Sequence, residues 1–156
     1  MTIDSFEQDM IRKNTRAARI IWMINVVTSV IIFLVFSNLQ FTKINNEPYV
    51  HYVLGALAIG ELIVIIVMRR IRLKPAVLKK LIERGGGEVA RNFFFMDIIS
   101  LALSDSVLIY GVVGYIITGD FEIMKMFAYV TALALIYFFP RENARIKQCQ
   151  DAFTVQ

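Results

Sequence analysis

The chain has 156 residues, of which 57% are hydrophobic and 19% charged, with a formal net charge of +4 and a mean hydropathy of +0.60. So little polar surface cannot cover a soluble globule of this length, and we expect an integral membrane protein. The one histidine, His51, is expected near the outer face, where it can complete no Ser-His-Asp or Cys-His set, and a single histidine and a single cysteine exclude paired-histidine haem ligation and an internal disulfide. The sequence also has no metal-cluster or nucleotide-binding motif, so we expect no enzyme.

Four apolar stretches follow one another along the chain, each near the roughly 20 residues that a helix needs to cross the hydrocarbon core. They cover about residues 20–37, 49–68, 93–117 and 121–139. The stretches are continuous rather than alternating, which favours helices over strands. The sequence predicts an all-α fold, a single domain over 1–156 with four transmembrane helices arranged as two hairpins.

The polar segment 4–19 precedes the first stretch. Its apolar Phe6, Met10 and Ile11 are spaced as in a short amphipathic helix, which could lie on the membrane surface. A solvated lead-in is an equal alternative.

The central loop, 69–92, is the longest polar segment. Its part 75–84, PAVLKKLIER, has apolar residues at helical spacing and a proline suited to a first turn, so we expect a short basic amphipathic helix. A solvated loop is the alternative. The following Gly85-Gly86-Gly87 is expected to be a hinge into the third span. The residues expected to contact lipid or a partner are Arg69, Arg70, Arg72, Lys79 and Lys80.

The distribution of positive charge predicts the topology. Of the seventeen Lys and Arg, only Lys43 and Lys125 fall in or beside the two hairpin tips, which leaves fifteen on the other side. By the positive-inside rule both termini and the central loop are cytoplasmic, and we expect a multi-pass protein of the cell (inner) membrane. This rule also accounts for the charge without nucleic-acid binding.

Two acidic residues, Glu61 and Asp105, lie in the middle of apolar stretches. Each is about 18 Å from the outer surface at ~1.5 Å per residue, so the two lie at matching depth. A carboxylate at that depth costs several kcal/mol unless it is protonated, paired or ion-bound. Antiparallel neighbours could bring the two close enough to share a proton or a cation.

Hydroxyl groups accompany Asp105 in the sequence. Ser104, Ser106 and Tyr110 offer the oxygen ligands that a Na⁺ ion or a proton-bearing carboxyl would need, and small residues such as Gly111 would let helices approach closely. The alternative for any one serine is a hydrogen bond back to its own helix. The candidate ion-binding residues are therefore Asp105, Glu61, Ser106, Tyr110 and Ser104, with H⁺ or Na⁺ as the possible ligand.

The stretch 101–111, LALSDSVLIYG, resembles the ion-binding helix of the rotor-ring proteolipid, subunit c of F- and V-type ATP synthases. Looser similarity covers LGALAIGE at 54–61 and Ala90-Arg91-Asn92, so the likeness extends over about residues 54–114. The resemblance implies that Asp105 is the ion-carrying carboxylate, with Ser106 and Tyr110 at positions that sodium-binding members use.

Two hypotheses follow for the function. The first is a membrane subunit that binds a proton or monovalent cation at a mid-membrane carboxylate, within a homo-oligomer or with other membrane subunits. The second is a non-catalytic scaffold or accessory subunit that binds lipid or a protein partner. We expect the lipid bilayer as partner, no nucleic acid, no cofactor and no structural metal.

Overall fold

A computed structural model describes residues 5–42, 48–85 and 87–154, and within these ranges the chain forms six α-helices and no strand. They are α1 (Ser5–Ser37), α2 (Pro48–Arg72), α3 (Pro75–Arg84), α4 (Glu88–Thr118), α5 (Phe121–Tyr137) and α6 (Glu142–Thr154). The predicted all-α fold is confirmed.

Three of these helices, α1, α2 and α4, are long and apolar enough to cross a membrane. At 17 residues α5 is shorter, and it meets the same length only together with α6, from which it is bent by 56°. The apolar stretch of α1 has no buried residue, whereas 44% of that of α4 is buried. Apolar side chains that stay unburied over most of the apolar stretches of α1 and α2 are typical of a protein surrounded by lipid, which supports a membrane protein.

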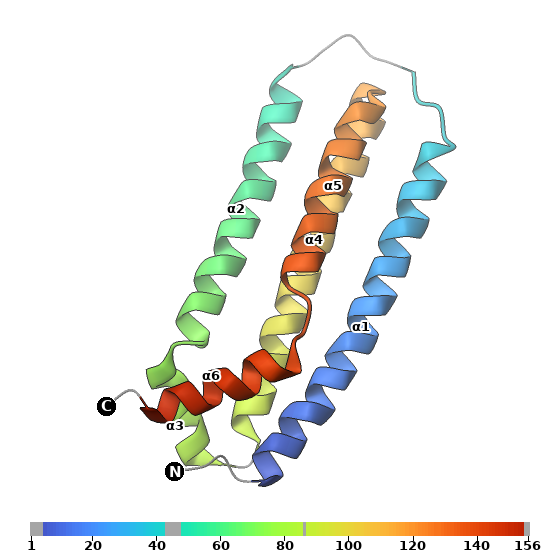
Figure 1. Ribbon diagram of the computed structural model, residues 1–156. Helices are drawn as coiled ribbons and strands as arrows, with labels where there is room; N and C mark the ends of the chain where they lie inside the picture. Colours follow the sequence, from blue (N-terminus) through green and yellow to red (C-terminus); the bar gives the residue numbers. More distant parts are fainter. Residues whose placement is uncertain (1–4, 43–47, 86, 155–156) are drawn as a thin grey trace.

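The centre of the bundle is α4, which packs against α5, α1 and α2 (Figure 1). Its close contact with α5 depends on two glycines. A Cβ at Gly111 would lie 2.6 Å from the Cβ of Phe127, and one at Gly114 would lie 2.9 Å from Cγ2 of Ile123. The expected role of Gly111 in close helix packing is confirmed, and Gly114 has the same role. Gly55 and Gly60 on α2, by contrast, have no neighbouring atoms where a Cβ would stand.

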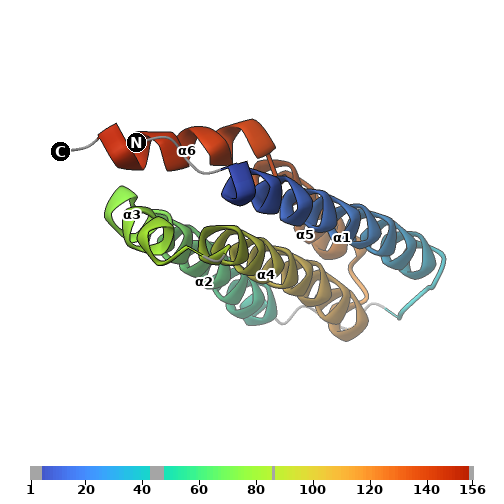
Figure 2. The same cartoon turned by 90° about the horizontal axis from the view of Figure 1, so that it is seen from below.

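The start of α1, the end of α2, α3, the start of α4 and α6 lie together at one end of the bundle (Figures 1 and 2). We call this the basic end, formed by residues 5–19, 69–85, 87–97 and 140–154. Here α6 runs across the bundle rather than along it (Figure 1). The predicted helix at 75–84 is confirmed as α3, with Pro75 in its first turn.

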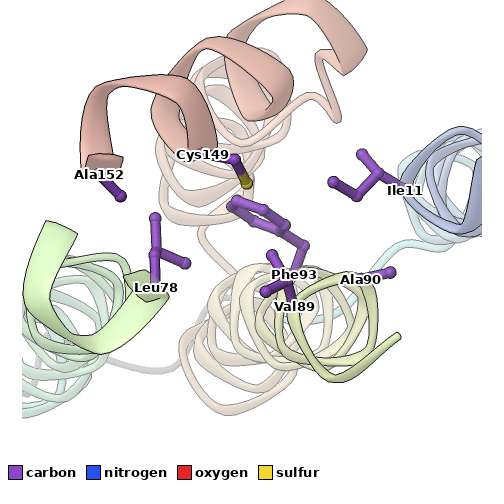
Figure 3. Close-up of a cluster of buried hydrophobic side chains, with 7 residues drawn as sticks. All are labelled: Ile11, Leu78, Val89, Ala90, Phe93, Cys149 and Ala152. Carbon is purple, nitrogen blue, oxygen red and sulfur yellow. The ribbon is translucent and has the colours of Figure 1, made fainter. Parts of the chain in front are cut away.

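The basic end has its own hydrophobic core, which side chains from four helices form (Figure 3). Its buried members are Ile11, Leu78, Val89, Ala90, Phe93, Cys149 and Ala152. Segment 5–19 therefore continues without a break into α1 and buries one face in this core, in place of a surface helix or a solvated lead-in. Its buried residues Glu7, Ile11, Thr15 and Ala18 recur every three or four positions, as one face of a helix does.

The turn between α3 and α4 uses the glycines as the sequence predicts. Gly85 and Gly87 have φ angles of 65° and 78°, in the left-handed region that glycine adopts without strain, and Gly86 lies outside the described residues. The Gly87 N–H donates to Oε1 of buried Glu7 at 2.8 Å, which fixes the start of α4 against α1. The Met10 side chain packs 3.1 Å from the place of a Cβ at Gly87.

Candidate functional site

The carboxylate of Glu61 lies between α2 and α4 and meets two hydroxyl groups of α4. The Tyr110 hydroxyl donates to Oε1 at 2.7 Å, and the Ser106 hydroxyl donates to Oε2. The Ser106 oxygen also lies 2.7 Å from the carbonyl oxygen of Leu103. Five oxygen atoms thus lie close together where α2 packs against α4: two from the carboxylate, two from hydroxyl groups and one from a carbonyl group. We call this the Glu61 site.

A hydroxyl group has a single proton, so Ser106 cannot fully satisfy both Glu61 and Leu103. If Glu61 carries a proton, it can donate to the Ser106 oxygen while Ser106 donates to the Leu103 carbonyl. A cation among the same oxygens would meet the same need, because hydroxyl and carbonyl oxygens bind it through lone pairs. A proton or a cation would therefore be compatible with the way these oxygens are arranged.

Asp105 lies on another face of α4 and has separate partners on α1. The Ser29 hydroxyl donates to Oδ1 at 3.4 Å, and the Asn25 side chain also hydrogen-bonds the carboxylate. Successive residues of a helix point about 100° apart, so Asp105 and Ser106 face different neighbours, whereas residues four apart share a face. Ser106 and Tyr110 accordingly accompany Glu61 and not Asp105.

Ser104, the remaining candidate, is fully buried, and its hydroxyl donates to the carbonyl oxygen of Ser100 at 2.7 Å. Ser100 in turn donates to the carbonyl of Met96 at the same distance. Both serines thus bond back to their own helix, which was the alternative interpretation for this residue type.

A second cluster of charge, which the sequence did not predict, lies buried at the basic end. Asp97 of α4 is 2% exposed and accepts a hydrogen bond from the guanidinium of Arg145 on α6, which is 4% exposed. Nη1 of Arg145 donates to the Thr15 hydroxyl at 2.8 Å, and Nη1 of Arg69 lies 3.7 Å from Oδ1 of Asp97. We call these four residues the Asp97 cluster. It ties α1, α2 and α6 to α4.

Helix α6, which carries the main partner of Asp97, was not among the predicted elements. The sequence does carry a helical pattern here, because Arg145, Cys149 and Ala152 are spaced as on one face of a helix, and all three are buried. Arg91, which is nearer to Asp97 in the sequence than Arg145 is, pairs with Glu88 at 2.9 Å.

The five basic residues expected to contact lipid or a partner lie in two places. Arg69 and Arg70 line hollows beside α6, and Arg69 also joins the Asp97 cluster. Arg72, Lys79 and Lys80 are exposed at the end of α2 and on α3.

Among the residues that the structure describes, no group of three or more His, Cys, Asp or Glu side chains is placed to hold a metal ion. Comparisons with models of protein families, with curated proteins and with solved structures found no match to this chain. The resemblance to the rotor-ring proteolipid therefore stays a prediction that rests on short motifs.

Proposed function

We propose that this chain is a small multi-pass membrane subunit that binds a proton or a monovalent cation at the Glu61 site, within an oligomer or a larger complex. The observation that carries the proposal is the shared hydroxyl of Ser106, which faces the acceptors of both Glu61 and Leu103. Asp105, with Asn25 and Ser29, is a second carboxylate at similar depth on another face of α4. The excess of Lys and Arg at the basic end favours a cytoplasmic position for this end, with the helices spanning the cell (inner) membrane.

Two properties make the Glu61 site suited to a mobile ligand. The side chain is only half-buried, because α2 lies at the edge of the bundle with large apolar side chains such as Ile63 exposed. An unpaired carboxylate in that setting costs several kcal/mol, so a bound proton or cation stabilises the folded protein. The ligands come from two helices, and a small movement of α2 against α4 would open the site.

The experiment is labelling of the full chain in lipid bilayers with an apolar carbodiimide, which attacks protonated carboxyl groups, followed by peptide mass spectrometry. Wild type is compared with Glu61→Gln and Asp105→Asn across pH, with and without Na⁺. Glu122, an exposed acid that pairs with Lys125, is the internal reference for labelling from water. Modification of Glu61 near neutral pH supports a proton site, and its suppression by Na⁺ supports a cation site.

The Asp97 cluster favours a second candidate function, a scaffold or accessory subunit whose folded basic end binds lipid or a protein partner. Its buried ion pairs hold four helices in one arrangement, as a docking module requires. Carbodiimide labelling that reaches Glu122 but leaves Glu61 and Asp105 unmodified at every pH would contradict the ion-binding proposal and favour this one.

A further inference from the structure

Two adjoining hollows open at the basic end, where the ends of α2 and α5 meet α6. The first, of about 570 Å³, lies between α5 and α6, and the second, of about 490 Å³, lies between the end of α2 and α6. Arg69, Tyr137 and Gln148 line both of them. We call the two together the basic cleft.

Five basic side chains line the basic cleft: Arg69, Arg70, Lys74, Arg141 and Arg145. None of the described residues that line it is acidic. The carboxylate of Asp97 lies behind the cleft and offsets one of these charges through its contacts with Arg145 and Arg69. A strong positive excess therefore remains, and the cleft suits an anion.

Aromatic rings hold two of the guanidinium groups in place. The Arg69 guanidinium lies 5.3 Å from the ring centre of Phe138, and that of Arg145 lies 5.4 Å from the ring centre of Phe93. Arg69 also donates to the Ser100 hydroxyl at 3.2 Å. Arginines fixed in this way lose little further freedom when they bind a phosphate, for which their planar fork of N–H groups is suited.

The side of the cleft formed by α5 is apolar and exposed. Leu133, Ile136 and Tyr137 line it and are 68%, 63% and 72% exposed. These side chains continue the outward-facing apolar surface of a helix that packs along the bundle, up to the point where the arginines begin. A soluble anion would make no use of that surface, whereas a phospholipid carries a phosphate next to its acyl chains and can contact both sides of the cleft.

We infer that the basic cleft binds an anionic phospholipid, with its phosphate among Arg69, Arg70 and Arg141 and its acyl chains along Leu133 and Ile136. This site is separate from the Glu61 site and does not depend on ion binding there. It places the end of α5 and the basic end at the headgroup layer of one leaflet.

The test uses the full-length protein in detergent with an equimolar mixture of phosphatidylglycerol and phosphatidylcholine, and native mass spectrometry to read which lipid stays bound. The variant is the double substitution Arg70→Gln with Arg141→Gln, because both side chains are exposed and lie outside the Asp97 cluster. The charge-matched control is Lys13→Gln with Arg16→Gln, both exposed on α1. A third arm adds inorganic phosphate to the wild type.

The expected result is a preference of wild type for phosphatidylglycerol, which the cleft variant lowers by about tenfold or more and the control leaves unchanged, since each basic residue near a headgroup adds a large factor. Inorganic phosphate at the concentration of the lipid should not displace it. If the variant and the control lose the preference for phosphatidylglycerol equally, the effect comes from overall charge, and the inference is overturned. A wild-type protein without a preference for phosphatidylglycerol would overturn it as well. Displacement of the lipid by inorganic phosphate would overturn it in favour of a soluble anion.

Discussion

Substitution of Arg145 by methionine should lower the stability of the basic end more than any other single substitution on α6. The guanidinium is buried and provides the direct hydrogen bond to Asp97, so its removal leaves a buried carboxylate with Arg69 at 3.7 Å as its remaining cation. Loss of one partner from a buried ion pair costs about 3–5 kcal/mol. Because Arg69 stays in place and Thr15 keeps its bond to the carbonyl of Ile11, we expect a value near the lower limit, about 3 kcal/mol.

The assay is reversible unfolding in mixed micelles followed by circular dichroism. Lys147→Met is the matched control, since Lys147 is exposed on the same helix, and it should stay within about 0.5 kcal/mol of wild type. The double variant Asp97→Asn with Arg145→Met removes both charges and should recover most of the lost stability. A loss for Arg145→Met no larger than that of the control would refute the reasoning, and so would a double variant less stable than Arg145→Met alone.

The remaining predictions concern packing and a buried thiol. Gly111→Ala should destabilise the bundle by about 1–3 kcal/mol because its Cβ would meet Phe127 at 2.6 Å, whereas Gly60→Ala, which meets no neighbour, should be neutral or slightly stabilising in the same unfolding assay. Burial, with a smaller effect of the Glu7 charge, raises the pKa of the Cys149 thiol from 9.0 to about 12, so we expect the folded protein to react with iodoacetamide far more slowly than the unfolded chain. Between those two pKa values the unfolded chain releases a proton that folded Cys149 retains, so stability should fall as pH rises, and a Cys149→Ala variant should lack this part of the pH dependence. Rapid labelling of the folded protein would contradict the observed burial.

The sequence predicts five of the six described helices, all but α6, because their signals are local. Continuous apolar stretches mark α1, α2, α4 and α5, and Pro75 together with the glycines at 85–87 marks both ends of α3. The bounds of α2 and α4 extend into the basic loop by up to five residues. That extension depends on contacts with the core of the basic end, such as the bond between Gly87 and Glu7, which hydropathy does not record.

The partners of each carboxylate are harder to predict because they depend on how helices turn toward one another. The sequence identifies Glu61 and Asp105 by their depth, and helical spacing links Ser106 with Tyr110. Which neighbouring helix that pair faces is decided by packing, and the structure places Glu61 there. The Asp97 cluster joins residues far apart in the chain, and no local pattern indicates its pairing with Arg145.

The most direct measurement of the central proposal is an infrared difference spectrum of the Glu61 carboxyl group in lipid bilayers as pH and Na⁺ are varied, with Glu61→Gln to assign the band. The proposal predicts a protonated carboxyl band near neutral pH that Na⁺ or alkali removes, and that Tyr110→Phe shifts because the 2.7 Å hydrogen bond is lost. A Glu61 carboxyl group that shows no protonated band from acidic to alkaline pH, with no response to Na⁺, would contradict it.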